Sequence, residues 1–240
     1  MALDAALMAR ARETGEAMLR VYAWATPTVS FGRHQAARGC YDKERIRARG
    51  LDVVRRPTGG RAILHHREVT YSVTAPVAGL GGFRESYARI NRLLLHGLAR
   101  IGVRVAVSAG GGRSPRPTEA PCFEVPVAGE LMIDGRKLAG SAQWREDGAL
   151  LQHGSILVED DQRSLAELLV TPPNAPPSPA TLRDALGRAP ATSEVADALF
   201  EAARSLEDPA ADVLMIDAEV SGAMQRALVL FVNDDWTWRR

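Results

Sequence analysis

Residues 130–158 read ELMIDGRKLAGSAQWREDGALLQHGSILV, in which three apolar-rich runs are separated by two Asp-Gly dipeptides. Asp-Gly between such runs favours a tight hairpin, because both positions of the two-residue turn adopt a positive φ. The segment therefore predicts strands over 130–134, 136–145 and 149–158, joined by turns at the two dipeptides. Strands joined in this way are antiparallel, which argues against a regular alternation of strands and helices and against a Rossmann fold.

Helices are expected on either side of these strands. Residues 2–18 have an amphipathic helical pattern, and residues 83–101 have the clearest one. In the second helix the apolar residues recur at spacings of four, three, four, four and three, at Phe83, Tyr87, Ile90, Leu94, Leu98 and Ile101. This spacing places them on one face of an α-helix, and that face must lie against a sheet. The sequence also predicts shorter strands over 19–24, 28–31, 51–56 and 62–73 and a short helix over 41–49. Together these elements give an α+β order.

A proline-rich stretch divides the chain. Residues 171–179, TPPNAPPSP, predict a stiff extended connector, and three helical patterns follow it. We therefore expect a core over 1–170, the connector over 171–179, and a helical C-terminal extension over 180–240 that packs on the core.

The composition is that of an ordinary globular chain of 240 residues, with 46% hydrophobic and 25% charged residues. No apolar run is long enough to span a bilayer, and residues 1–16 resemble an amphipathic helix rather than a cleavable signal, so a cytoplasmic protein is expected. Two cysteines, Cys40 and Cys122, cannot build a disulfide framework. In a reducing compartment each is either a small buried apolar residue or a reactive thiol.

Charge is distributed unevenly although the net charge is only +1. Residues 33–67 carry ten Lys or Arg against three acids, whereas residues 194–219 carry eight acids against a single arginine. The basic stretch either attracts an acidic partner at long range or is simply the surface of an arginine-rich chain, and the sequence leaves both interpretations open.

Cys122 and Lys137 are the candidate catalytic pair. Cys122 follows a Gly- and Pro-rich loop over 108–117, where a thiol can be exposed, and Lys137 lies fifteen residues further on. A thiol with a pKa of about 8.5 is mostly protonated at neutral pH, and a nearby ammonium lowers that pKa and so supplies the nucleophilic thiolate. From these residues alone, a buried thiol and a solvated lysine are the simpler alternatives.

Further candidates surround the glycine pair of RRPTGGR, residues 55–61. Glycines between two strands let a ligand approach the backbone, and the flanking arginines suit an anion such as an acyl carrier's phosphate; a plain hairpin turn with surface arginines is the alternative. His153 is suited to orienting a substrate or relaying a proton, and small residues at 140–142 indicate a close approach of ligand or backbone. His65 and His66 point to opposite faces of a strand and cannot share a metal ion, so no metal site is expected.

Seven segments, in this order, resemble the biotin/lipoate A/B protein ligase family. They are MALDAAL (1–7), WATPTVSFGRHQ (24–35), VVRRPTGGRAILHH (53–66), VTYSV (69–73), CFEVP (122–126), GRKLAGSAQWR (135–145) and LLQHGSILV (150–158). Within the family the chain is most similar to the octanoyltransferase branch related to lipoate-protein ligase A. Arg61 stands where ligases typically have a third glycine, and ligases generally lack a cysteine at the place of Cys122.

The resemblance implies both a fold and a site. The fold is α+β, with a central mixed, largely antiparallel sheet flanked by helices, and residues 1–170 form an acyltransferase catalytic core. Cys122 carries the acyl group as a thioester, and Lys137 lowers the pKa of its thiol. Residues 56–65 roof an acyl pocket, with Ile63 and Leu138 among its apolar lining. The candidate substrate-binding residues are Arg56, Thr58, Gly59, Gly60, Arg61, His65, Gly140, Ser141, Ala142 and His153.

The implied reaction moves an octanoyl group from acyl carrier protein, through the Cys122 thioester, to a lysine of a lipoyl domain such as the glycine cleavage H protein. Exchange of one thioester for another needs no ATP, so we expect no cofactor, and no nucleic acid or membrane partner. One alternative is an ATP-dependent lipoate-protein ligase, in which Lys137 holds an acyl-adenylate. Others are a noncatalytic acyl or lipoyl-domain binding module and amidotransfer between two lipoyl domains. The pair His65-His66 replaces the His-Asp that is usual in the family.

Overall fold

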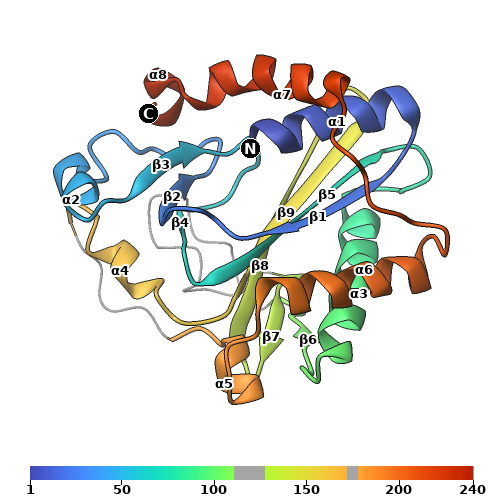
Figure 1. Cartoon of the computed structure of the whole chain (residues 1–240). Coiled ribbons are helices and arrows are strands. Elements are labelled where there is room, and N and C mark those ends of the chain that lie inside the picture. The colour runs from blue at the N-terminus through green and yellow to red at the C-terminus, as the bar shows by residue number, and fades with distance from the viewer. Residues whose placement is uncertain (111–127, 172–177, 240) are drawn as a thin grey trace.

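Two sheets organise the residues that the computed structural model describes, which are 1–110, 128–171 and 178–239 (Figure 1). The larger sheet is antiparallel, with six strands in the order β1-β5-β9-β8-β7-β6. The smaller sheet has the order β3-β2-β4, with β3 parallel to β2. The strands are β1 Met18–Tyr22, β2 Thr28–Phe31, β3 Asp52–Arg55, β4 Ile63–His65, β5 Glu68–Pro76, β6 Ala106–Val107, β7 Leu131–Ile133, β8 Arg136–Glu146 and β9 Ala149–Leu157. The α+β class is confirmed, with the parallel pair confined to the smaller sheet.

Both predicted hairpins are present. Asp134 and Gly135 have φ angles of 48° and 74°, and Asp147 and Gly148 have φ angles of 47° and 81°. These positive values are those that a two-residue hairpin turn requires. The three strands that the turns connect therefore lie side by side, with β8 between β7 and β9. β9 is buried along its whole length, because β5 and β8 flank its edges and other elements pack on the faces of the sheet.

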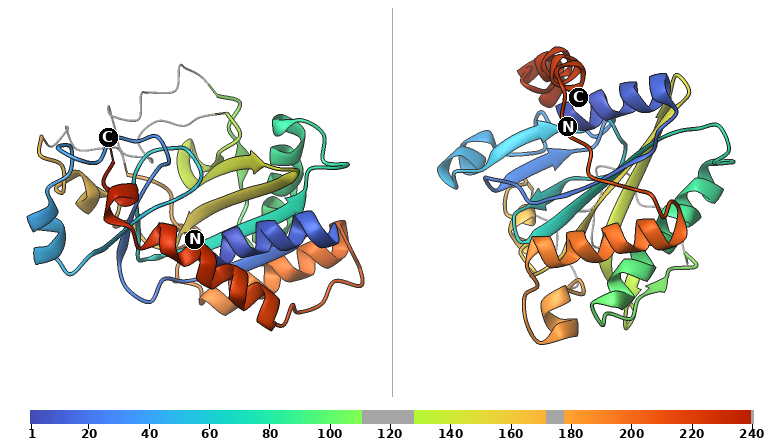
Figure 2. Two further views of the ribbon diagram at one scale, coloured as in Figure 1. Left: turned by 90° about the horizontal axis from the view of Figure 1, so that it is seen from above. Right: turned by 45° about the vertical axis from the view of Figure 1, so that its right-hand side comes forward.

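Helices cover both faces of the larger sheet, as Figures 1 and 2 show. On one face α1, Ala2–Thr14, packs on β5 and β9, and α7, Ala218–Phe231, runs beside α1. The opposite face is covered by α3 Phe83–Arg100, α5 Leu182–Leu186 and α6 Thr192–Leu206. The smaller sheet is surrounded by α2 Lys43–Ala48, α4 Arg163–Ala166 and α8 Asp234–Thr237. Within the described ranges, no helix combines the length and apolar character needed to cross a bilayer.

The main hydrophobic core lies between the larger sheet and α3, α5 and α6. Leu94 and Leu98 of α3 are fully buried there, together with Leu199 of α6 and Tyr71 of β5. The apolar face predicted for the helix over 83–101 is therefore confirmed in its central turns. Phe83, the first residue of α3, is an exception at 55% exposure. Its ring centroid lies 4.7 Å from the guanidinium of Arg145 rather than in the core.

Some predicted boundaries were wrong. The first helix ends at Thr14 rather than at residue 18, because Gly15 adopts a left-handed conformation with φ 76° and caps it. The strand expected over 62–73 is broken into β4 and β5, and four helices rather than three follow residue 179. Residues 111–117 of the expected loop and 172–177 of the expected connector lie outside the described residues. The division into core, connector and extension stays a prediction.

Candidate functional site

A cavity lies where the smaller sheet meets the larger one. The segment after β3 and strand β4 form one wall, and strands β5, β8 and β9 form the other. Seven of the predicted substrate-binding residues line it, namely Arg56, Gly60, His65, Gly140, Ser141, Ala142 and His153. Ile63, predicted as an apolar lining residue, also lines it. The other four lining residues, which were not predicted, are Met1, Thr70, Gly154 and Ser155. Thr70 and Ser155 face each other across β5 and β9, a pairing that depends on the register of the two strands.

Arg56 organises the glycine segment that roofs the cavity. Its guanidinium donates to the carbonyl oxygens of Ser30 at 2.9 Å, Gly59 at 3.1 Å and Arg61 at 2.6 Å. The segment also packs closely on the end of β2, since a Cβ added to Gly32 would lie 2.0 Å from the Gly60 carbonyl oxygen. The backbone of residues 56–61 is therefore held by polar contacts and by close approach to β2.

The arginines of RRPTGGR are interior residues. Arg55, Arg56 and Arg61 are 0%, 3% and 6% exposed. The Arg55 guanidinium donates to main-chain carbonyls, among them those of Trp236 and Gln35. Buried guanidinium groups need such partners, because an unpaired charge inside a protein is strongly destabilising. The surface-turn alternative is wrong because these arginines are buried.

Thr58 and His153 join the two walls of the cavity. The Thr58 hydroxyl lies 2.6 Å from Nε2 of His153, which is 5% exposed in strand β9. Burial lowers the pKa of His153 to about 3, even though the nearby carboxylate of Asp4 acts in the opposite direction. The imidazole is therefore neutral at physiological pH, and it contributes hydrogen bonding rather than positive charge.

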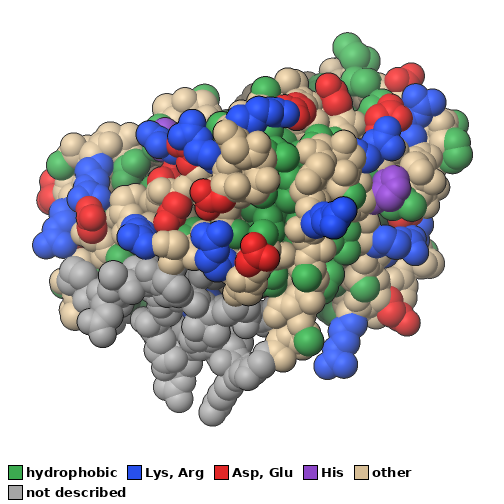
Figure 3. All heavy atoms as spheres, turned by 90° about the horizontal axis from the view of Figure 1, so that it is seen from below, with side chains coloured by type: hydrophobic (Ala, Val, Ile, Leu, Met, Phe, Trp, Pro, Cys, Tyr) green, Lys and Arg blue, Asp and Glu red, His purple; other side chains and the backbone are tan. Residues whose placement is uncertain are grey.

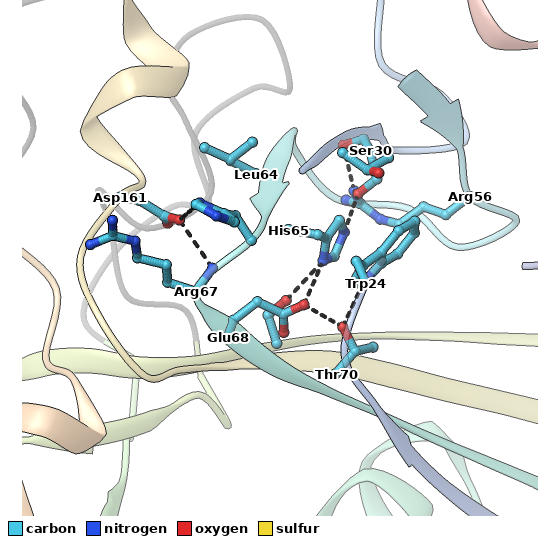
Figure 4. A network of polar contacts seen from close by, with 12 residues as sticks. Trp24, Ser30, Arg56, Leu64, His65, Arg67, Glu68, Thr70 and Asp161 are labelled. Atoms are coloured by element: carbon cyan, nitrogen blue, oxygen red, sulfur yellow. Dashed lines mark hydrogen bonds and ion pairs between the residues drawn. The ribbon is translucent and has the colours of Figure 1, made fainter. Parts of the chain in front are cut away.

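His65 is held by partners on both ring nitrogens (Figure 4). Its Nε2 lies 2.7 Å from the Ser30 hydroxyl, and its Nδ1 lies 3.1 Å from Oε1 of Glu68. Its ring stacks on Trp24, with centroids 4.4 Å apart. These contacts on both nitrogens and on the ring face fix the orientation of His65 at the cavity wall. His66 is exposed and pairs with Asp161 at 3.3 Å, so the expectation that the two histidines point apart is confirmed.

The donors and acceptors around His65 have fixed directions. Trp24 donates to the Thr70 hydroxyl at 2.9 Å, so the Thr70 proton goes to Glu68 at 2.5 Å. Arg56 donates to the Ser30 hydroxyl at 2.8 Å, and that hydroxyl lies 2.7 Å from Nε2 of His65. A carboxylate only accepts hydrogen bonds, so Nδ1 of His65 donates to Glu68. Among the described residues, no group of three or more His, Cys, Asp or Glu side chains is arranged to hold a metal ion.

Small residues of β8 and β9 form the floor of the cavity. The Ser141 hydroxyl bonds Tyr71 at 2.6 Å, and a Cβ added to Gly154 would lie 2.5 Å from the Gly140 carbonyl oxygen. The expectation that residues 140–142 mark a close backbone approach is confirmed by this contact.

Lys137 is buried, so the solvated alternative for this residue is wrong. It is 2% exposed and forms an ion pair with the carboxylate of Glu130. Leu131 of β7 pairs with Ala139, whereas Met132 pairs with Lys137, so Leu138 is an extra residue in β8. This β-bulge places Lys137 on the same face of β8 as Gly140 of the cavity floor.

Two further residues were predicted for the site, namely Cys122, the other member of the catalytic pair, and Leu138, an apolar lining residue. Cys122 lies outside the described residues. Leu138 packs in the main core with Leu131 and Ala139 and does not line the cavity, so its predicted place in the acyl pocket was wrong. The bulge is the reason, because it turns Leu138 toward the helices on the opposite face.

Ion pairs neutralise much of the basic stretch. Arg45, Arg47, Arg49 and Arg67 pair with Asp42, Glu44, Glu167 and Glu159, respectively. Figure 3 shows the same mixture, with acidic and basic side chains interspersed over one face of the molecule. The described residues therefore favour an ordinary mixed surface over a broad basic patch.

The class of protein follows from the fold. A bi-partite lipoate protein ligase from Thermoplasma acidophilum has a TM-score of 0.75 at 20% identity, over 99% of this chain and 89% of that one. Lipoate-protein ligase A bound with ATP has a TM-score of 0.79 at 21% identity, over 99% and 92%. The fold is thus that of lipoate-protein ligases.

The sequence comparisons identify the family within that class. Residues 1–204 match the model of the lipoyl protein ligase A/B catalytic domain, and the chain belongs to this family. Octanoyltransferase LipM of Symbiobacterium thermophilum is 40% identical over 100% of this chain and 93% of its own length. Octanoyltransferase LipM of Kyrpidia tusciae is 35% identical over 100% and 94%. The family resemblance of the seven segments is confirmed.

Proposed function

We propose that this protein is an octanoyltransferase of lipoate biosynthesis, which attaches the octanoyl group to a lysine of a lipoyl domain. The observation that carries the proposal is the full-length similarity to proteins named octanoyltransferase, at 35% and 40% identity. The ligases that share the fold are only about half as similar in sequence, at 20% and 21%. Enzymatic acyl transfer is therefore favoured over both the ATP-dependent ligase and the noncatalytic binding module.

In the proposed mechanism, octanoyl acyl carrier protein is the donor and Cys122 is the nucleophile. The thiolate of Cys122 attacks the thioester carbonyl, the carbon–sulfur bond of the donor breaks, and the carrier's thiol leaves with a proton. The lysine amine of a lipoyl domain, such as the H protein of glycine cleavage, then attacks the new thioester. An amide forms, the lysine nitrogen loses a proton, and the Cys122 thiol is regenerated. No step requires ATP or a cofactor.

Lys137 supports this mechanism through its burial. An ammonium in a partly dry environment stabilises a neighbouring anion more strongly than one in water, because the local dielectric is lower. Lys137 is 2% exposed and lies on the cavity face of β8, and Glu130 holds its ammonium. The proposal assigns Lys137 the role of lowering the pKa of the Cys122 thiol.

The cavity supports the proposal through its lining. Ile63 supplies an apolar wall, and the small residues Gly140, Ala142 and Gly154 leave the floor open to a flexible chain. The neutral imidazole of His153 adds no charge that an octanoyl chain would have to desolvate. We assign the acyl chain to this cavity, beneath the segment over 56–65.

Intact mass spectrometry tests the mechanism directly. The protein is mixed with octanoyl acyl carrier protein, and the expected result is a mass gain of one octanoyl group that hydroxylamine removes. Cys122→Ser should abolish this adduct and octanoyl transfer, whereas Cys40→Ser, which alters a thiol packed beside the smaller sheet, should retain both.

The same experiment separates the alternatives. Unchanged mass with ATP-dependent labelling of a lipoyl domain by free octanoic acid would identify a ligase. Unchanged mass with no labelling under either condition would identify a binding module. An adduct that forms from an octanoylated lipoyl domain but not from the carrier protein would identify amidotransfer between lipoyl domains.

A further inference from the structure

Arg33 differs from the paired arginines of the stretch over 33–67. Its guanidinium makes one long hydrogen bond, 3.5 Å, to the Pro57 carbonyl oxygen. Otherwise it lies over aromatic rings, 4.7 Å from the Trp144 centroid and 5.8 Å from the Trp236 centroid. Among residues 1–110, 128–171 and 178–239, no carboxylate forms an ion pair with it.

A second guanidinium lies beside it. Arg239 is 4.0 Å from the Trp236 centroid, and it donates a hydrogen bond to the main-chain oxygen of Arg33. Partial burial, and to a smaller extent the positive charge of Arg33, lower the pKa of Arg239. Arg239 likewise has no acidic partner in the described part of the chain. Two neighbouring cations without a counter-charge favour the binding of an anion.

The two guanidiniums border the candidate site. The Arg33 amide donates to the Thr58 carbonyl oxygen at 2.8 Å, which ties Arg33 to the segment that roofs the cavity. Trp144 lies two residues beyond Ala142 on the same face of β8, opposite Leu151 as Ala142 is opposite His153. An anion held here would therefore lie at the rim of the cavity.

We propose that Arg33 and Arg239, framed by Trp144 and Trp236, bind the phosphate of the donor's phosphopantetheine arm. This inference rests on the proposed function, in which a carrier protein presents the octanoyl thioester. A guanidinium matches phosphate with two parallel N–H donors, and aromatic faces on either side restrict its orientation. The arm carries its thioester at one end and its phosphate nearer the carrier, so a cationic rim beside an apolar cavity suits both ends.

The site is tested with three octanoyl donors, of which one lacks the phosphate and two carry it. They are octanoyl-pantetheine, octanoyl-4′-phosphopantetheine and octanoyl acyl carrier protein. Arg33→Gln should raise KM about tenfold to a hundredfold for the two phosphate-containing donors, the range expected for a lost charged hydrogen bond, and leave octanoyl-pantetheine within about twofold. Arg239→Gln should act in the same direction. Arg47→Gln is the matched control, because Arg47 is exposed and pairs with Glu44 on α2, and it should change none of the three.

Direct binding provides a readout that does not depend on catalysis. By titration calorimetry, wild type should bind 4′-phosphopantetheine more tightly than pantetheine, and Arg33→Gln should remove that preference, with Arg33→Lys restoring part of it. Equal losses on all three donors would mean that Arg33 only supports the roof. A loss confined to the carrier protein would place the anion on the carrier's surface. Either result overturns the phosphate site. A different result, in which the protein binds phosphopantetheine but forms no octanoyl adduct, would overturn the proposed function alone.

Discussion

The polar side chains that line the cavity are hydrogen-bonded within the protein. His153 is neutral because burial lowers its pKa to about 3, and both ring nitrogens of His65 have hydrogen-bond partners within the protein. The guanidinium of Arg56 lines the cavity and is bonded to main-chain carbonyls, whereas Lys137 is paired to Glu130 and Arg33 lies over the Trp144 ring. An apolar substrate therefore meets hydrogen-bonded groups that need not be desolvated again.

The buried His153 predicts how stability changes with pH. In the unfolded chain its pKa returns to about 6.5, so at lower pH the unfolded state binds a proton that the folded state does not. The stabilisation is complete above about pH 6.5 and is lost as the pH falls toward the folded pKa of about 3. The slope from this residue approaches about 1.4 kcal/mol per pH unit.

Urea unfolding of wild type and of the variant His153→Gln, compared between pH 7.5 and 4.5, measures this effect. The variant lacks the titrating ring, so the stability advantage of wild type should shrink steadily below pH 6.5. An advantage that stays constant over this range would show that His153 titrates normally in the folded protein.

At the scale of elements, the roof segment depends on one unusual backbone conformation. Gly60 has a φ of 97°, and a Cβ added there would lie 2.9 Å from the Arg56 guanidinium nitrogen. Gly59 has an ordinary φ and no heavy atom within 4 Å of an added Cβ. The two adjacent glycines therefore have different roles, because only Gly60 adopts a conformation that other residues avoid.

Alanine substitution separates the two glycines. Gly60→Ala should lower the free energy of unfolding by about 1–3 kcal/mol, from backbone strain and displacement of Arg56. Gly59→Ala should change it by less than about 1 kcal/mol, since the methyl group meets open space. Thermal and urea unfolding measure both. Equal effects at the two positions would contradict the assignment of the restraint to Gly60.

For the whole molecule, Arg55 connects parts of the chain that are distant in sequence. Its guanidinium donates to the carbonyl oxygens of Gln35 at 2.7 Å, Trp236 at 2.9 Å and Arg239 at 3.1 Å. The Trp236 indole returns a hydrogen bond to the Arg55 carbonyl oxygen at 3.0 Å. The Arg55 guanidinium and the Trp236 indole thereby connect α8 to β3 of the smaller sheet.

Replacing this side chain should loosen α8 before it affects the larger sheet. Arg55→Lys keeps the charge but lacks the planar set of donors, so several carbonyls lose partners and the expected loss is about 2–4 kcal/mol. Hydrogen exchange should accelerate first over Asn233–Trp238, the residues of α8 and its caps. Arg47→Gln, an exposed change, should stay within about 0.5 kcal/mol. Uniform acceleration over the whole chain would show that Arg55 has no local role.

Features that depend on neighbouring residues could be predicted from the sequence. The Asp-Gly turns, the central turns of α3 and the divergence of His65 from His66 were correct, because backbone preferences and side-chain periodicity act within a few residues. Much of the cavity lining was also predicted, since the motifs of the family mark the glycine segment and strands β8 and β9. The chemistry of octanoyl transfer came with that resemblance.

Other features depended on segments brought together by folding. Lys137 shares a face with Gly140 only because the pairing of β7 with β8 leaves Leu138 as an extra residue. Thr70 meets Ser155 only through the register of β5 and β9. Burial and ion pairing are properties of distant partners, so the tertiary structure alone turned Arg55 and Arg56 inward and left Arg33 without a carboxylate among the residues it describes.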